Sequence, residues 1–274
     1  MLFLSFDTSG RELTVALFEG GTGHNSGDTE SGGKILAQER IDFGELAAHD
    51  PRLPLSAPPV GGKKTNRQES VSLLIPTIDK LLSESGRAKA DIACLAVGIG
   101  PGGFTGIRVA ITTARTIAQA LKVPLVPVNS LELACFDLQS KTALGIIKEA
   151  SRTHCYMAVY APAESRDMEF TDVSAVVLPR YLTYEAMVEE RGLAPQWYCD
   201  ASALERLPQL ENSKLLPPVK NIAAEQAKIA WLRVSLKGIT EPAAFHYRLT
   251  EPLYLRGASV TLKKGNAIEK VESN

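Results

Sequence analysis

The sequence predicts a mixed α/β protein built from two lobes. Three observations support this fold class: short apolar strands alternate with amphipathic helices, a glycine-rich turn joins a strand to a helix at residues 98–106, and the chain is 274 residues long. At about 150 residues per domain, that length suggests two compact units or one large one. An apolar content of 45% with 22% charged residues excludes a wholly disordered chain and a fibrous one.

The charge balance and the cysteines limit the function classes. Thirty basic and 31 acidic residues give a net charge of -1, which argues against a chain that binds nucleic acid unaided, although it allows a local basic patch. No C-x-x-C pair occurs among the cysteines, which indicates reduced thiols rather than a zinc site or a disulfide framework; they are Cys94, Cys135, Cys155 and Cys199. The first apolar run ends at Asp7, too early for a signal peptide, and no run approaches the ~18 apolar residues of a membrane span. We therefore expect a soluble, cytoplasmic protein without membrane contacts.

The first lobe, residues 1–129, is predicted to begin with three strands at residues 3–6, 13–18 and 34–41. Two insertions that are expected to lack regular secondary structure (low-order insertions) interrupt this lobe. Residues 20–33 hold six glycines, and residues 42–66 hold clustered prolines, so neither stretch can bury enough apolar area to offset its ordering entropy. The second insertion is either a neutral loop or a partner-binding lid.

Two helices complete the predicted first lobe. Residues 68–83 carry apolar side chains at spacings of three and four around Pro76, and residues 104–121 follow the glycine-rich turn. Buried strands are predicted at residues 91–99 and 125–128. The resulting order, β-β-β-α-β-α-β, is that of one lobe of an actin-like fold, as in sugar kinases and heat-shock ATPases.

The second lobe is predicted over residues 130–274. Its strand candidates lie at residues 144–147, 156–160 and 196–199. A helix at residues 221–236 and a polar C-terminal tail follow, and both could pack back on the first lobe. No internal repeat is strong enough in the sequence to support the division into lobes.

The glycine-rich turn is the most informative motif. Glycines allow a close approach of the backbone to a partner, and the free N–H groups at a helix start attract anions. The turn is not a phosphate-binding P-loop, because no Lys-Ser/Thr pair follows its last glycine. Spacing alone leaves two interpretations open: a ligand cradle, or a tight connection that seats the helix close to the sheet.

The full string Gly-Pro-Gly-Gly-Phe-Thr-Gly-Ile-Arg at residues 100–108 resembles the signature of the TsaB (YeaZ) family, usually G-P-G-S-F-T-G-x-R. Gly103 replaces the usual serine. The opening Asp7-Thr8-Ser9 resembles the family's start, and residues 251–256 (E-P-L-Y-L-R) resemble its E-P-x-Y-L-R ending. The likeness covers nearly the whole chain apart from the two insertions.

This resemblance implies an actin-like fold and a role in tRNA modification. In the family, TsaB dimerises with its paralogue TsaD and keeps it active. Together with the ATPase TsaE, they transfer a threonylcarbamoyl group to the tRNA adenosine beside the anticodon. By this likeness we expect a non-catalytic subunit that forms a heterodimer with TsaD, a homodimer when alone, and contacts tRNA only through the complex. The family is also called glycoprotease (peptidase M22-type). We interpret this as an older name that was carried over, and we do not take it as evidence for peptidase activity.

The residues argue against an active site of the chain's own. In TsaD an H-x-x-x-H pair on the first helix holds a metal, whereas Ser70 and Leu74 stand near those positions here, and no two histidines have ligand spacing. We therefore assign no catalytic and no metal-binding residues. The turns at residues 148–151 and 199–203 carry alanines where an actin-like ATPase needs glycine to admit its nucleotide.

The residues of the family motifs could still form a weak contact with a nucleotide. Asp7 could hold a metal–nucleotide, or it is a strand-end turn residue. The candidate contacts are Asp7, Thr8, Gly100, Gly102, Gly103, Thr105, Gly106 and Arg108. We expect no cofactor of the chain's own, with ATP or ADP bound at low affinity or at the TsaD interface.

Apolar faces on the two helices of the first lobe predict the partner interface. Its candidate residues are Val71, Leu74, Ile75, Ile78, Phe104, Ile107, Ile111, Ala114 and Ala118. The substitution Ile111→Glu is then expected to abolish pairing while the monomer stays folded. The alternative is that these faces are buried against the chain's own sheet and the helix at 221–236. The alternative function is an independent actin-like ATPase or kinase, or a metallopeptidase.

Overall fold

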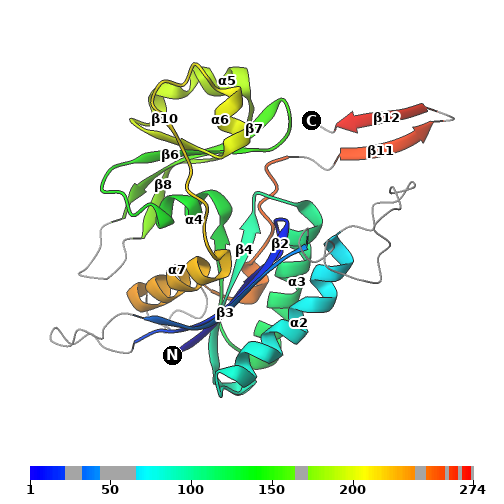
Figure 1. Ribbon diagram of the computed structural model, residues 1–274, viewed down its shortest axis with the longest axis vertical. Helices are drawn as coiled ribbons and strands as arrows, with labels where there is room; N and C mark the ends of the chain where they lie inside the picture. Colours follow the sequence, from blue (N-terminus) through cyan, green and yellow to red (C-terminus); the bar gives the residue numbers. More distant parts are fainter. Residues whose placement is uncertain are drawn as a thin grey trace.

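Two five-stranded mixed sheets, one above the other, form the framework of the computed structural model (Figure 1). The structure describes residues 1–21, 33–43, 66–163, 172–237, 245–256, 259–264 and 267–272. Most of the two predicted insertions therefore lies outside the described residues.

The first sheet has the strand order β3-β2-β1-β4-β5. Its strands are β1 (Leu2–Asp7), β2 (Glu12–Glu19), β3 (Lys34–Asp42), β4 (Ile92–Gly100) and β5 (Leu125–Asn129). The first three strands form an antiparallel meander, and β4 and β5 continue the sheet in parallel with β1. The central strands β1 and β4 are buried on both faces, which explains their nearly continuous apolar sequence.

Helices cover both faces of the first sheet. The helices are α2 (Asn66–Glu84), α3 (Phe104–Leu121) and α7 (Ile222–Lys237). The first two pack on one face, whereas α7 comes from far along the chain and covers the other face with Ala227, Ala230 and Trp231 (Figure 1). A core of apolar side chains therefore lies on each side of the sheet.

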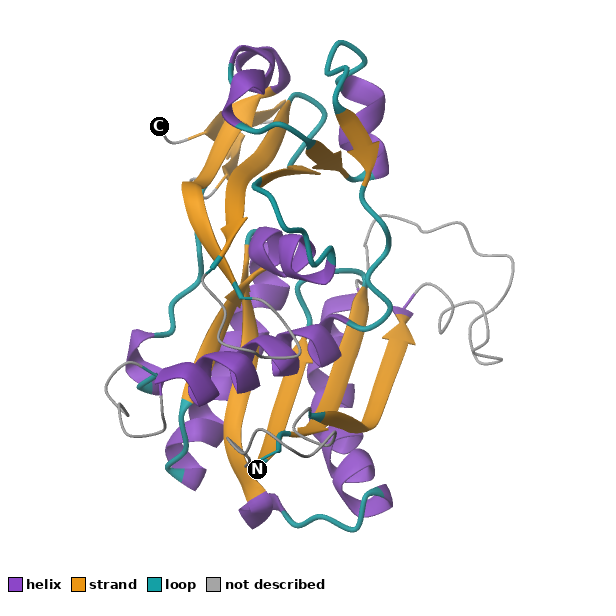
Figure 2. Ribbon diagram, turned by 90° about the vertical axis from the view of Figure 1, so that its left-hand side faces the viewer, coloured by secondary structure: helices purple, strands orange, loops and turns teal. Residues whose placement is uncertain are grey.

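The second sheet repeats the topology of the first. Its order, β8-β7-β6-β9-β10, is an antiparallel meander extended by two parallel strands. The strands are β6 (Leu144–Glu149), β7 (His154–Pro162), β8 (Val173–Thr183), β9 (Trp197–Cys199) and β10 (Ser213–Leu215). The short helices α5 (Tyr184–Glu189) and α6 (Ala201–Arg206) pack on this sheet (Figure 2).

The helix α4 (Ser130–Asp137) lies between the two sheets. Leu133 and Phe136 belong to the core beneath α7, whereas Leu131 and Ala134 pack against the second sheet. A helix that buries opposite sides of itself in two cores fixes those cores relative to each other.

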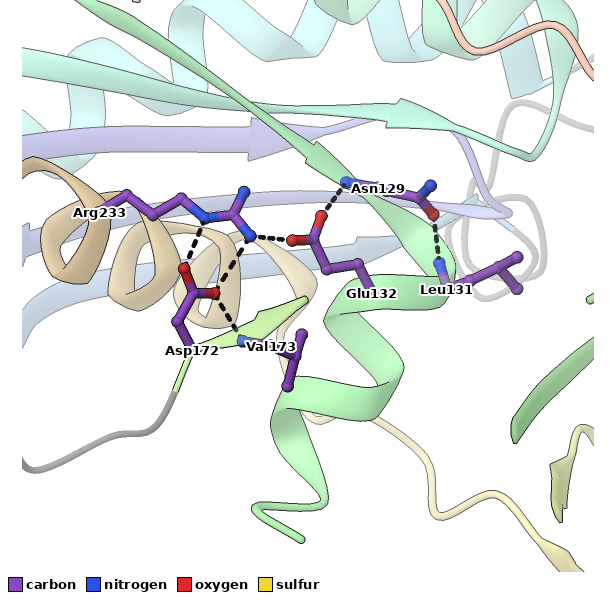
Figure 3. A network of polar contacts seen from close by, with 6 residues as sticks. All are labelled: Asn129, Leu131, Glu132, Asp172, Val173 and Arg233. Atoms are coloured by element: carbon purple, nitrogen blue, oxygen red, sulfur yellow. Dashed lines mark hydrogen bonds and ion pairs between the residues drawn. The ribbon is translucent and has the colours of Figure 1, made fainter. Parts of the chain in front are cut away.

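A polar network beside α4 joins three elements (Figure 3). Arg233 of α7 donates to Asp172 at the start of β8, with Nε and Nη2 each 3.1 Å from a carboxylate oxygen. It also forms an ion pair with Glu132 of α4, whose second oxygen accepts a hydrogen bond from the Asn129 backbone at 3.3 Å. The three charged side chains are only 13–17% exposed, so this network ties α7 and α4 to the second sheet.

Most elements expected from the sequence are confirmed, including the helix that contains Pro76. The sequence-based description missed β8 and the short elements of the second lobe. The remaining 3-10 helices are η1 (Lys89–Asp91), η2 (Arg191–Leu193) and η3 (Tyr247–Leu249). The C-terminal tail is not irregular throughout, because β11 (Ser259–Lys264) and β12 (Ala267–Glu272) pair as an antiparallel hairpin. Among the described residues, every helix is too short or too polar to span a membrane.

Candidate functional site

The three sequence motifs, which are far apart in the chain, meet at one end of the first sheet. The turn after β1 contacts the glycine-rich turn, where the Gly103 backbone N–H donates to the Ser9 carbonyl oxygen at 2.9 Å. The C-terminal motif reaches the same place, since the Leu253 N–H donates to the Ile99 carbonyl oxygen at 2.9 Å. The residues that carry the family resemblance therefore form one continuous structural unit.

Asp7 is buried, and both of its carboxylate oxygens already accept hydrogen bonds. Oδ1 accepts from the Ser9 backbone N–H at 2.8 Å and from the Ser9 hydroxyl at 2.6 Å. Oδ2 accepts from the Gln226 side-chain amide at 3.0 Å, and the Ser5 hydroxyl donates to the other end of that amide at 3.0 Å. Asp7 is 2% exposed and Gln226 is also 2% exposed. The carboxylate thus links the turn after β1 to α7 through hydrogen bonds. This agrees with the interpretation of Asp7 as a turn residue at the end of a strand.

The glycines of the signature allow the first turn of α3 to lie directly on the turn after β1. A Cβ atom at Gly106 would stand 1.8 Å from the Thr8 carbonyl oxygen, and one at Gly103 would stand 2.7 Å from that of Ser9. The Thr8 hydroxyl in turn donates to the Gly106 carbonyl oxygen at 2.7 Å. The glycines therefore allow two segments of the same backbone to approach each other. This agrees with the interpretation of the turn as a tight connection that seats the helix, and not with a ligand cradle.

The substitution Gly106→Ala is expected to destabilise the chain by about 2 to 3 kcal/mol, because the added methyl group meets a backbone oxygen rather than a movable side chain. Urea unfolding followed by circular dichroism measures the loss. The matched control is Gly192→Ala, since a Cβ at Gly192 meets nothing within 4 Å. Equal unfolding midpoints for the two variants would contradict the close contact.

The other residues of the signature differ in their surroundings. Gly100 has a φ of 95°, a left-handed conformation that favours glycine. Gly102 and Arg108 are exposed, and Thr105 is half-buried. The Gly102 and Gly103 peptides lie at the surface beside the start of α3.

Lys148 brings a positive charge from the second sheet to this region. It is the penultimate residue of β6, and its ammonium group donates to the Ser130 carbonyl oxygen at 3.1 Å. Burial lowers the pKa of Lys148, while the negative charges of Asp200 and Asp7 oppose this shift. Asp200 caps α6 by accepting from the Ala203 N–H at 2.8 Å, and it also accepts from the Glu149 N–H at 2.8 Å. The predicted second-lobe turns thus contribute a lysine whose charge interacts with those of Asp7 and Asp200.

An exposed aromatic pair lies at the start of α3. The rings of Phe104 and Tyr254 stack with centroids 4.9 Å apart, and the Arg108 guanidinium lies 5.1 Å from the Phe104 centroid. Phe104 is 44% exposed and Tyr254 is 47% exposed. Aromatic and arginine side chains of this kind are typical of interface hot spots.

The assignment of the apolar helix faces to a partner needs correction. Six of the nine predicted interface residues are buried in the core that α2 and α3 form against the chain's own sheet: Leu74, Ile78, Ile107, Ile111, Ala114 and Ala118. The faces are apolar because they pack on the chain's own first sheet, α2 against β2 and β3 and α3 mainly against β4, and not on α7, which covers the opposite face of the sheet. Ile75, 44% exposed, and Phe104 remain at the surface, and the side chain of Val71 lies outside the described residues.

Four side chains of this region were not predicted as site residues, although Tyr254 belongs to the C-terminal motif and Lys148 to a predicted turn: Ser5, Gln226, Lys148 and Tyr254. Gln226 lies more than 200 residues from Asp7, and nothing local marks a glutamine on a helix as a partner of a distant carboxylate. Ser5 gives a weak signal, since it is a polar residue within a buried strand. Lys148 directly follows the apolar residues of β6 and could have been noticed for that reason.

The cysteines and the described residue His154 take part in packing. All four cysteines are free and buried, and burial raises the pKa of Cys135, Cys155 and Cys199 to about 12. His154 stacks on Tyr181 with ring centroids 4.6 Å apart. Within the described part of the chain, no three His, Cys, Asp or Glu side chains gather closely enough to hold a metal ion.

Comparisons with known proteins agree on one family. A family model for TsaD, tRNA N6-adenosine threonylcarbamoyltransferase, matches residues 64–202. The tRNA threonylcarbamoyladenosine biosynthesis protein TsaB of Escherichia coli K12 is 26% identical over 200 residues, which cover 72% of this chain and 84% of that protein. The Bacillus subtilis protein of the same name is 33% identical over 87 residues, or 31% of this chain and 38% of that protein.

A solved structure resembles the fold over almost the whole chain. YeaZ from Pseudomonas aeruginosa superposes with a TM-score of 0.58 and 21% sequence identity, covering 93% of this chain and 99% of that one. At 21% sequence identity, this similarity is evidence for a shared fold.

Proposed function

The chain belongs to the TsaD family, in its TsaB/YeaZ group, and from this premise we propose that it is a non-catalytic subunit in the synthesis of threonylcarbamoyladenosine in tRNA. It pairs with a TsaD protein, keeps that partner active, and works with the ATPase TsaE in the cytoplasm. The observation that carries this proposal is the convergence of the three family motifs into one unit beside the exposed Phe104–Tyr254 pair.

The fold supports the proposal. Two sheets with the same strand order, each an antiparallel meander extended by two parallel strands, are the arrangement of an actin-like protein with two lobes. We assign the lobes to residues 1–129 and 130–274, with α7 of the second segment covering the sheet of the first. A TsaD partner of the same family would present similar helices for pairing.

Non-catalytic action is supported by how the motif residues are engaged. Both oxygens of Asp7 accept protein hydrogen bonds, and the Gly103 N–H and the Thr8 hydroxyl donate to backbone carbonyl oxygens. These groups therefore stabilise the fold of the chain rather than facing a substrate. We propose no cofactor of the chain's own, and place any ATP or ADP at low affinity or at the joint interface with TsaD.

We place the pairing surface on the exposed side of the first lobe's helices. Ile75 of α2 and Phe104 of α3 are each 44% exposed and leave apolar surface uncovered on these two helices. Tyr254 and Arg108 extend the surface at Phe104. In the absence of TsaD, a second copy of the chain would cover the same apolar groups as a homodimer.

Reconstitution tests the function. Purified TsaD and TsaE, tRNA, threonine, bicarbonate, ATP and the enzyme that makes the threonylcarbamoyl donor are incubated with and without this chain, and threonylcarbamoyladenosine is measured by mass spectrometry of digested tRNA. Modification that depends on the chain is the expected result. Full modification without it would contradict the proposal.

The substitution Phe104→Glu is expected to weaken association with TsaD by about 2 kcal/mol or more, because it replaces a stacked aromatic anchor by a charge. Analytical ultracentrifugation of an equimolar mixture measures the change. Since Phe104 is exposed, the unfolding midpoint should stay near that of the native chain. The matched control is Leu193→Glu, a substitution of another exposed apolar residue, 40% exposed, in η2 of the second lobe. Equal loss of pairing in both variants would place the surface elsewhere.

A further inference from the structure

A polar groove lies between α3 and η3, on the lobe that carries the family motifs. It has a volume of about 440 Å³ and is lined by Thr112, Arg115, Thr116, Gln119, Tyr247 and Arg248. The helix α3 supplies four of these side chains and η3 supplies two. The groove is fixed in place because Tyr247 packs against the core beneath α3 and the Phe245 carbonyl oxygen accepts a hydrogen bond from the Leu125 N–H at 2.9 Å.

The groove is basic, although the chain as a whole has a net charge of -1. The helix α3 carries Arg108 and Arg115 and no acidic residue along its 18 residues. Arg248 faces Arg115 from the other side of the groove, and Lys122 follows at the end of α3. Among the residues that the structure describes, no carboxylate forms an ion pair with Arg115 or Arg248.

Five other arginines of the described residues have a carboxylate partner. Arg40, Arg87, Arg180, Arg206 and Arg233 each form an ion pair with a described aspartate or glutamate. Two guanidinium groups that share one groove without a carboxylate repel each other and attract an anion. The Thr112 hydroxyl and the Gln119 amide lie beside them and can donate to oxygen atoms, whereas the Thr116 hydroxyl donates to the Thr112 carbonyl oxygen at 2.9 Å.

Aromatic rings stand at the edge of the groove. The Tyr247 ring stacks on that of His246 with centroids 4.5 Å apart and an interplanar angle of 27°, and the Arg248 guanidinium lies 5.9 Å from the Tyr247 centroid. His246 is exposed, and its Nδ1 accepts a hydrogen bond from the Arg248 backbone N–H at 3.3 Å, which fixes the ring. A flat, oriented ring next to guanidinium groups offers a surface on which a nucleobase can stack.

We propose that this groove binds RNA directly, with Arg115 and Arg248 on phosphate groups and the His246–Tyr247 pair beneath a base. This goes beyond the proposed function, in which tRNA is reached only through TsaD. An acidic protein surface would also satisfy the arginines, but carboxylates would make no use of the stacked rings. The groove, between the second half of α3 and η3, leaves Ile75 and Phe104 free for pairing.

Fluorescence anisotropy with a labelled, unmodified tRNA transcript tests the proposal on the full chain without TsaD. The double variant Arg115→Glu/Arg248→Glu is expected to bind at least about tenfold more weakly, and the slope of log K against log salt to fall by about 1.5 to 2 for two lost phosphate contacts. The matched control, Arg152→Glu/Lys214→Glu, makes the same charge change at two exposed sites of the second lobe and should bind like the native chain.

Competition identifies the chemistry that is recognised. Unlabelled RNA should displace the probe at lower concentration than polyphosphate or polyglutamate of equal charge, because only RNA supplies a base for the rings. Undiminished tRNA binding by the double variant would overturn the proposal, as would equal displacement by polyphosphate. Stronger displacement by polyglutamate would do so too, by assigning the groove to an acidic protein.

The experiments distinguish a failure of the RNA-binding proposal from a failure of the proposed subunit function. Tight, groove-dependent RNA binding together with modification that does not need the chain would retain the RNA site and reject the subunit role. Modification that needs the chain, together with tRNA binding unchanged in the double variant, would do the opposite. The unfolding midpoint of the double variant checks that the fold is intact.

Discussion

The substitution Ile111→Glu is expected to unfold the chain rather than to release a partner from it. Ile111 lies on the side of α3 that faces the first sheet, is 3% exposed, and belongs to the core with Leu4, Leu95 and Leu125. A carboxylate at this position would be surrounded by the apolar side chains of this core. We expect a loss of about 4 kcal/mol or more, because an unpaired charge is buried and the packing of a large side chain is lost.

Urea unfolding followed by far-ultraviolet circular dichroism measures the effect. The neighbouring substitution Thr112→Glu places the same charge one residue further along α3, on its exposed side, and should change the free energy of unfolding by no more than about 0.5 kcal/mol. A folded Ile111→Glu monomer that no longer pairs with TsaD would restore the interface expected from the apolar pattern alone.

The substitution Arg233→Met is expected to cost about 3 kcal/mol of stability, because it leaves two poorly exposed carboxylates without their shared cation. Arg233 binds Asp172 through two nitrogen atoms at 3.1 Å and also pairs with Glu132. The loss should fall as the pH is lowered towards 4.5, because protonation of either carboxylate removes the repulsion between them.

Thermal or urea unfolding at pH 7.5 and pH 4.5 checks this expectation. Arg233→Lys keeps a charge but not the forked geometry, so an intermediate loss is expected. The double variant Arg233→Met/Glu132→Gln removes the repulsion and should recover part of the stability. A loss that is independent of pH, and that the second substitution does not reduce, would mean that only the packing of the long side chain matters.

Periodicity predicted the regular elements well wherever a strand or helix has one consistent environment. The strands β1 and β4 are buried on both faces and read as apolar runs, and α3 carries apolar residues at helical spacing. The strand β8 was missed because it is a sheet edge, where Val176 and Leu178 are 61% and 73% exposed and no simple alternation results.

The candidate site was predicted in part. The sequence marked Asp7, Thr8 and the glycines, and the structure brings them together with residues 252–254. The sequence could not say what the glycines approach. A glycine admits a ligand and a second backbone segment equally well, and only the position of the Thr8 and Ser9 carbonyl oxygens distinguishes the two.

Composition, spacing and motif order by themselves determined the fold class, the positions of the main helices and strands, and the family, because these properties follow from local periodicity and from strings of residues along the chain. The tertiary structure decided which way each apolar face points, since an amphipathic pattern is the same whether it meets the chain's own sheet or another protein. It also decided that Gln226 meets Asp7 and that Arg248 faces Arg115, because contacts between distant segments depend on how the sheets and helices pack.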